Sequence, residues 1–146
     1  MGEVIDFNTG EVINSKYCLE RAQYWREQHF YAKEFYYHNM GAEQGCPKCL
    51  YKVGISYLFG HSAVNDAGMR ANIKKSIKYL ILSAEKGNDK SYHWLGSIYY
   101  KGYRVKPDLN KALFYYKKAP VCNSAIIAIE NIERRIKNNK DNKNDK

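Results

Sequence analysis

The sequence predicts an all-α protein, a short α/α solenoid built from helical repeats. Two observations lead to this fold class: one stretch of the chain recurs further along, and each copy carries apolar residues at helical spacing. The composition agrees, because 45% of the 146 residues are hydrophobic and only three prolines interrupt the chain. The length is that of one domain.

The first helix of the repeat is found by placing residues 49–60 under residues 91–102. An aliphatic residue, two glycines and a tyrosine match at an offset of 42 residues. The matched pairs are Val53 with Leu95, Gly54 with Gly96, Tyr57 with Tyr99, and Gly60 with Gly102. The chain therefore contains two copies of one helix.

In each repeat a second helix follows the first, and the two second helices align with each other at a different offset. Four small or aromatic positions align at an offset of 36 residues. The pairs are Ser76 with Ala112, Tyr79 with Tyr115, Leu80 with Tyr116, and Ser83 with Ala119. Because this offset is the shorter one, the first repeat must carry an insertion, which we place in the loop of residues 60–71.

The repeated positions have physical reasons. A glycine in mid-helix costs about 1 kcal/mol relative to alanine, so Gly54 and Gly96 indicate close approach of a neighbouring helix. Gly60 and Gly102 follow their helices, where a glycine in the left-handed region is common. Asp108 follows a proline and can cap the next helix.

The rest of the chain is assigned around these repeats. Residues 1–14 form a small β-hairpin or an extended tail, because two β-prone runs flank Asn8-Thr9-Gly10. A single helical-repeat domain covers residues 15–137, and Asn14 or Ser15 is the N-cap of its first helix. It comprises a degenerate repeat (15–45), two repeats (46–87 and 88–122) and a capping helix (123–137). Residues 138–146 have no apolar residue and should be disordered.

Charge is unevenly distributed along the chain. The net charge is +9, with −3 in residues 1–45 and +12 in residues 46–146. An acidic protein or a nucleic acid is therefore a natural partner for the second half. The start of the sequence lacks a secretory pattern and no apolar run is long enough for a membrane span, so we expect a cytoplasmic protein without membrane contact.

These residues resemble the Sel-1-like repeat, a relative of the tetratricopeptide repeat. The copy at 88–122 matches closely, and the copy at 46–87 departs in its loop, where Met69 and Asn72 replace the usual Val and Asp. The resemblance implies antiparallel helix pairs in a right-handed superhelix and an adaptor or scaffold role, commonly in bacteria. The pattern is carried by Ser91, Leu95, Gly96, Tyr99, Gly102, Val105, Asp108, Ala112, Tyr115 and Ala119.

The first helix of each repeat should line the concave face of such a solenoid. We therefore predict a protein-binding surface on the helix stripes opposite the paired helices, unless the N-terminal helices or the hairpin cover it. An inhibitory role, like that of an immunity protein or a phage inhibitor, is a possible specialisation, and the chain can be a monomer or a homodimer. The predicted partner-binding residues are Tyr51, Ile55, Leu58, Phe59, His93, Tyr100 and Lys101.

Two other functions have weaker support. Lysines on the second helices, such as Lys74, Lys78 and Lys117, are usually a solvated face, and the alternative is a nucleic-acid patch. Cys46 and Cys49 form a Cys-x-x-Cys pair, but redox motifs of this kind accompany a βαβ unit, and packing explains Cys49. We expect Cys18 and Cys122 to be buried thiols, and we expect no metal, no cofactor and no enzymatic activity.

Overall fold

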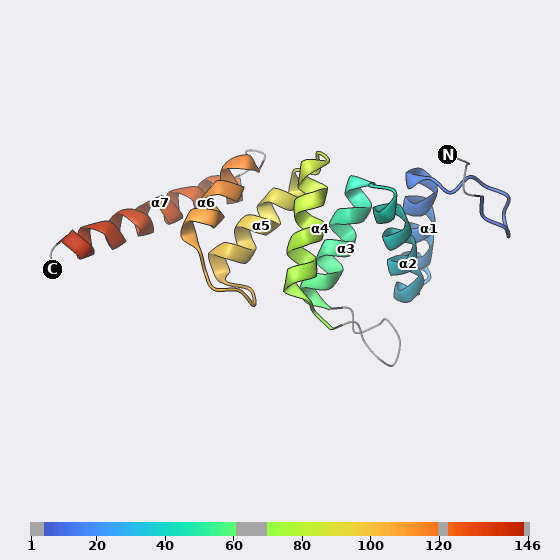
Figure 1. The fold of residues 1–146 in the computed structure, drawn as a ribbon, viewed down its shortest axis with the longest axis horizontal. Coiled ribbons are helices and arrows are strands. Elements are labelled where there is room, and N and C mark those ends of the chain that lie inside the picture. The colour runs from blue at the N-terminus through green and yellow to red at the C-terminus, as the bar shows by residue number, and fades with distance from the viewer. Residues whose placement is uncertain (1–4, 61–69, 120–122, 145–146) are drawn as a thin grey trace. The chain divides into compact units, whose positions relative to one another are not determined.

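The structure is a computed structural model that describes residues 5–60, 70–119 and 123–144. The described ranges contain seven α-helices, in agreement with the predicted all-α class (Figure 1). The chain divides into two compact units, residues 1–88 and residues 89–146, and each unit is described by itself. The helices are α1 (Ser15–Glu27), α2 (Tyr31–Glu43), α3 (Pro47–Phe59), α4 (Ile73–Glu85), α5 (Lys90–Lys101), α6 (Leu109–Lys118) and α7 (Asn123–Asn144).

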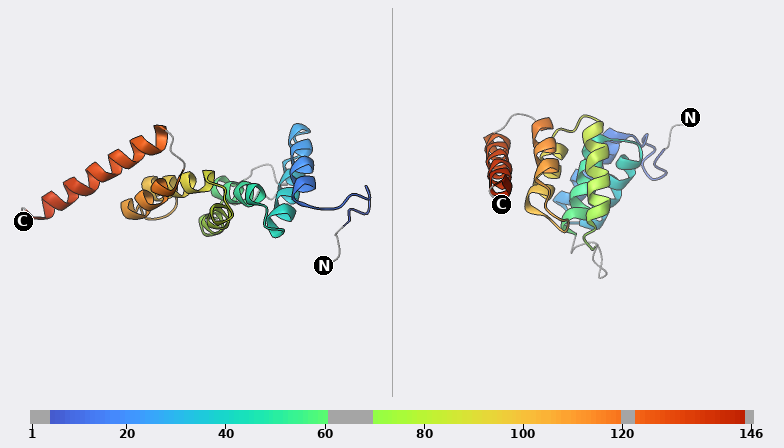
Figure 2. Two further views of the ribbon diagram at one scale, coloured as in Figure 1. Left: turned by 90° about the horizontal axis from the view of Figure 1, so that it is seen from above. Right: turned by 60° about the vertical axis from the view of Figure 1, so that its left-hand side comes forward.

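Unit 1 contains α1 to α4, and each helix packs on the next (Figure 2). Its core lies where α1, α2 and α3 meet, and small residues there allow the helices to approach closely. A Cβ atom on Gly41 of α2 would lie 2.5 Å from Sγ of Cys49 on α3, so only glycine fits this crossing. The buried members of the core are Tyr17, Cys18, Ala42, Cys46, Cys49, Leu50 and Val53.

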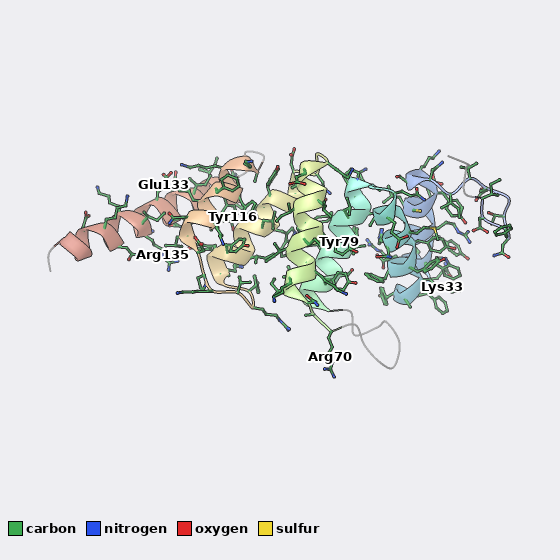
Figure 3. All side chains as sticks on the ribbon, in the orientation of Figure 1. Lys33, Arg70, Tyr79, Tyr116, Glu133 and Arg135 are labelled. Atoms are coloured by element: carbon green, nitrogen blue, oxygen red, sulfur yellow. The ribbon has the colours of Figure 1, made fainter. Side chains whose placement is uncertain are left out.

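Unit 2 contains α5 to α7, and α6 packs against both of the other helices. The ring of Tyr116 on α6 packs against α5, where a Cβ on Gly96 would come within 2.8 Å of it (Figure 3). α7 then packs on α6 through Ala125 and Ile132, which are buried together with Ala112 and Tyr116. The capping helix therefore supplies half of the buried side chains of this core.

The helix starts follow the sequence closely. The side chain of Asn14 accepts a hydrogen bond from the Tyr17 amide (2.9 Å) and caps α1. Asn72 caps α4 and Asp108 caps α6 in the same way, each from the residue before the helix. The Asn72 found in place of the family's Asp thus keeps the capping function. Gly60 and Gly102 both have positive φ, but only Gly102 is left-handed helical.

Both ends of the chain differ in detail from expectation. Ile5 and Val12 form one antiparallel bridge, but the described N-terminal residues contain no strand, so the hairpin, one of the two alternatives for this segment, is present only as a single bridged turn. At the other end α7 continues to Asn144, where we expected a disordered tail from residue 138. Extending an existing helix is far easier than starting one, and apolar residues are not needed for it. The predicted insertion (mostly residues 61–69) and Cys122 lie outside the described residues.

Candidate functional site

Two adjoining cavities open on unit 1 between α1, α2 and α3. Their volumes are about 330 Å³ and 390 Å³, and they share Arg26, His38 and Lys52. We call them together the α1–α3 groove. The smaller cavity has apolar walls from Tyr31, Phe35 and Ile55. A concave site with apolar walls and a few placed polar groups is the usual form of a binding pocket.

A buried polar cluster forms one wall of the groove. Glu34 on α2 accepts two hydrogen bonds from the Arg26 guanidinium on α1, from Nε at 2.8 Å and from Nη2. The side chain of Glu34 is only 11% exposed, so this pairing offsets the cost of removing its charge from water. His38 lies one turn further along α2, with Nε2 3.5 Å from the same Glu34 oxygen.

His38 is the most unusual member of the cluster. It is buried, and neither ring nitrogen has a hydrogen-bond partner among the described residues. Burial lowers the pKa of His38 to about 4, and the nearby Lys52 ammonium acts in the same direction, although Glu34 opposes it. The imidazole is therefore neutral at pH 7. The positive charge of the groove comes from Arg26, Lys48 and Lys52 alone.

The local sequence explains how these groups come together. Glu34 and His38 are four residues apart on α2, so both point toward the same neighbours. Phe35, next to Glu34, packs on Tyr57 of α3 with the ring centroids 6.0 Å apart. Sequence reasoning missed this cluster. Its signal was a Glu–His pair at i, i+4 in a helix whose other residues are largely aromatic.

The predicted binding residues of unit 1 have different outcomes. Ile55 lines the groove, and Tyr51, one turn before it, is half-buried. Phe59 is 55% exposed, but it is not among the groove residues. The prediction for Leu58 is wrong, because this side chain is only 4% exposed and cannot contact a partner. The reason is that α3 packs on both α2 and α4, which leaves little of its surface free.

The predicted partner-binding residues of unit 2 make more contacts within the protein than expected. The His93 ring lies 5.4 Å from the Tyr116 ring, and its Nε2 is 3.3 Å from the Ser124 hydroxyl. Tyr100 packs against the core shared by α6 and α7, beneath the Arg135 guanidinium. Helix α7 thus occupies part of the stripe expected to be open. Lys101 is exposed, with Nζ 5.7 Å from the centroid of the Tyr103 ring.

The lysines of the second helices make a repeated contact. In unit 1 the Tyr57 and Tyr79 rings stack 5.7 Å apart, and Lys75 Nζ lies 5.1 Å from the Tyr57 centroid. In unit 2 the equivalent Tyr99 and Tyr115 rings stack 5.8 Å apart beneath Lys111. These tyrosines therefore pack within their own helix pair, with lysines held over them by cation–π attraction, and this weakens the nucleic-acid interpretation.

The Cys-x-x-Cys pair is part of the core. Cys46 is the N-cap residue of α3, and its sulfur accepts a hydrogen bond from the Cys49 amide at 3.4 Å. Burial raises the pKa of the Cys49 thiol, and also that of Cys18. A raised pKa disfavours the thiolate needed for redox exchange. Among the described residues, no group of three or more His, Cys, Asp or Glu side chains could hold a metal ion.

Comparison with known proteins fits this architecture. The Sel1 repeat profile matches residues 47–88 and 89–119, which is half of the chain. The chain belongs to the Sel1 repeat family. Members of this family are generally non-catalytic scaffolds that mediate protein interactions. Of the helices described here, none is both long and apolar enough to cross a membrane.

Solved structures of Sel1 repeat proteins share the fold. A Sel1 repeat protein from Oxalobacter formigenes superposes with a TM-score of 0.58 at 17% identity, over 72% of this chain and 41% of that one. A protective antigen of uropathogenic Escherichia coli with an SLR fold gives a TM-score of 0.56 at 22% identity, over 69% and 21%. This Sel1 repeat chain thus spans less than half of either neighbour. No curated protein matches the sequence.

Proposed function

We propose that this chain is a non-catalytic protein-binding module that holds a segment of a partner protein in the α1–α3 groove. The observation that carries the proposal is the groove itself, in which polar groups lie beside the apolar walls of Tyr31, Phe35 and Ile55. Such a surface combines burial of apolar side chains with a small number of orienting polar contacts. One of the walls, Ile55, belongs to the binding surface predicted from the repeat pattern.

The groove is poorly arranged for chemistry. Its serine, Ser56, donates its hydroxyl hydrogen bond to the Lys52 carbonyl oxygen (2.9 Å), along its own helix. Nucleophilic catalysis needs a hydroxyl or thiol within reach of a base. The carboxylate of Glu34 is engaged by Arg26, and the buried thiols lie in the core. These contacts favour binding over catalysis.

The test is a capture experiment from the native host, followed by binding of the purified partner. An Ile55→Glu variant places a charge on the groove wall, and Ile127→Glu is its matched control, because Ile127 is 57% exposed on α7. We expect wild type and Ile127→Glu to retain the same partner, and Ile55→Glu to weaken its binding at least about tenfold. Thermal melts of all three proteins establish that they are folded. A partner bound equally by Ile55→Glu would contradict the proposal.

An inhibitory role is the more specific form of this proposal. A small chain that occupies one segment of its partner can block that segment from other ligands. The captured partner is therefore assayed with and without the chain at concentrations above the dissociation constant. Unchanged partner activity would leave the binding proposal standing and remove the inhibitory one.

A further inference from the structure

The larger cavity of the α1–α3 groove has an excess of positive charge. It is lined by three cationic side chains, Arg26, Lys48 and Lys52, and by one acidic side chain, Glu27. Glu27 also accepts a hydrogen bond from Gln23 at 3.1 Å. His38 lies in the same wall but is neutral at pH 7 because of its burial. Because Arg26 is paired with Glu34 of the adjoining cavity, the other charges of this cavity are those of Lys48, Lys52 and Glu27, an excess of one positive charge.

The two lysines are placed to act together. Lys48 and Lys52 are four residues apart on α3, so their side chains emerge from the same face of the helix. Lys52 also lines the smaller cavity, where the apolar walls of Phe35 and Ile55 lie beside the Arg26–Glu34 pair. A segment that spans both cavities would meet cations at one position and apolar walls at the next.

We infer that the groove selects an acidic peptide segment, with a carboxylate side chain between Lys48 and Lys52 and an apolar side chain against Phe35 and Ile55. The inference rests on the proposed function and specifies the chemistry of the partner. Charge complementarity identifies the occupant, because a carboxylate gains attraction from two ammonium groups beside low-dielectric walls. The Arg26 guanidinium is held by Glu34 and helps to form the wall.

Two blocked peptides test the inference directly. The first is acetyl-Glu-Leu-Glu-Leu-Glu-Leu-amide, and the second has glutamine in place of each glutamate. We expect the acidic peptide to bind the full chain at least about tenfold more tightly than the glutamine peptide. In ¹H–¹⁵N spectra its addition should shift the amides of Lys48 and Lys52. Equal affinities, or no saturable binding of either peptide, would overturn the inference.

Lysine variants locate the selectivity. A Lys48→Met/Lys52→Met variant should bind the two peptides equally, at the affinity wild type shows for the glutamine peptide. Lys74→Met/Lys78→Met is the matched control, because these lysines have the same spacing on α4 and do not line the groove. We expect it to keep the full tenfold preference. Loss of the preference in the control as well would show a diffuse charge effect and reject the site.

Two further experiments distinguish an acidic peptide from other ligand classes, and distinguish failure of this inference from failure of the proposed function. Glutarate that binds as tightly as the acidic peptide would reassign the site to small dicarboxylic acids, and displacement of the peptide by a single-stranded oligonucleotide would reassign it to nucleic acid. Ile55→Glu should weaken both peptides. If it does so while wild type shows no preference, the groove binds protein segments and only the carboxylate selectivity is wrong.

Discussion

The imidazole of His38 is 6% exposed, and burial lowers its pKa to about 4, against 6.5 for an exposed histidine. In the unfolded chain this group takes up a proton near pH 6.5, whereas in the folded chain it does so only near pH 4. Between these values the unfolded state binds more protons. The free energy of unfolding should therefore fall as the pH drops through this window, by up to about 3 kcal/mol.

Urea unfolding at pH 7 and pH 5 measures this effect. In a His38→Gln variant the fall between the two pH values should be smaller by about 2 kcal/mol, because the titrating group is gone. His29→Asn is a suitable control, since His29 is exposed and asparagine tolerates its positive φ of 59°. An identical pH response in wild type and His38→Gln would show that His38 does not control acid stability.

At the scale of single helices, the pair α5 and α6 depends on one close contact. A methyl group on Gly96 would lie 2.8 to 3.0 Å from three atoms of the Tyr116 ring, at the base of the ring where rotation gives little relief. Alanine would gain about 1 kcal/mol in helix propensity. Overpacking typically costs about 1–3 kcal/mol, and a rigid aromatic ring favours the upper part of that range. We expect Gly96→Ala to destabilise unit 2 by about 1–2 kcal/mol net.

A double-mutant cycle isolates this contact. Tyr116→Leu alone should destabilise the protein, because Tyr116 is buried. Adding Gly96→Ala to that variant should cost much less than adding it to wild type, since the ring is no longer there. Denaturant unfolding supplies all four free energies. Strict additivity would indicate that the helices shift apart freely and that glycine is not required at this crossing.

The helix pairs also show which features the sequence can predict. The cap at Asp108 and the crossings at Gly54 and Gly96 depend on local chain geometry or on a repeated pattern, and the structure has them as predicted. Of the two candidate N-caps of α1, Asn14 and Ser15, the structure uses Asn14. Burial of Leu58 depends instead on which helices surround α3, and no local pattern encodes that. The contacts of His93 and Tyr100 depend in the same way on the position of α7.

The groove was harder to predict for a related reason. Ile55 was found because it belongs to the repeat, but Glu34 and His38 lie in the degenerate copy, where no second copy exists for comparison. The pairing of Glu34 with Arg26 joins two helices across a turn that contains His29 at positive φ. A partly buried ion pair of this kind follows from tertiary packing, and composition alone carried no sign of it.

On the scale of the whole molecule, the two units offer separate probes of folding. The sequence has two tryptophans, Trp25 in unit 1 and Trp94 in unit 2. Trp25→Phe and Trp94→Phe variants each leave one fluorescent reporter. In repeat proteins stability is the sum of terms within repeats and terms between neighbours. A change confined to one core should therefore affect its own reporter most.

Ile132→Ala provides that change. Ile132 on α7 is fully buried against Ala112, Tyr116 and Ala125, and removing its side chain should cost unit 2 about 2–5 kcal/mol. We expect the denaturant midpoint of the Trp94 transition to fall sharply and that of Trp25 to fall less, by an amount that measures the coupling between units. Ile127→Ala, at an exposed site on the same helix, should move neither midpoint. Equal shifts of both reporters would mean that the chain unfolds as one cooperative body, so that a partner bound in the α1–α3 groove would stabilise unit 2 as strongly as unit 1.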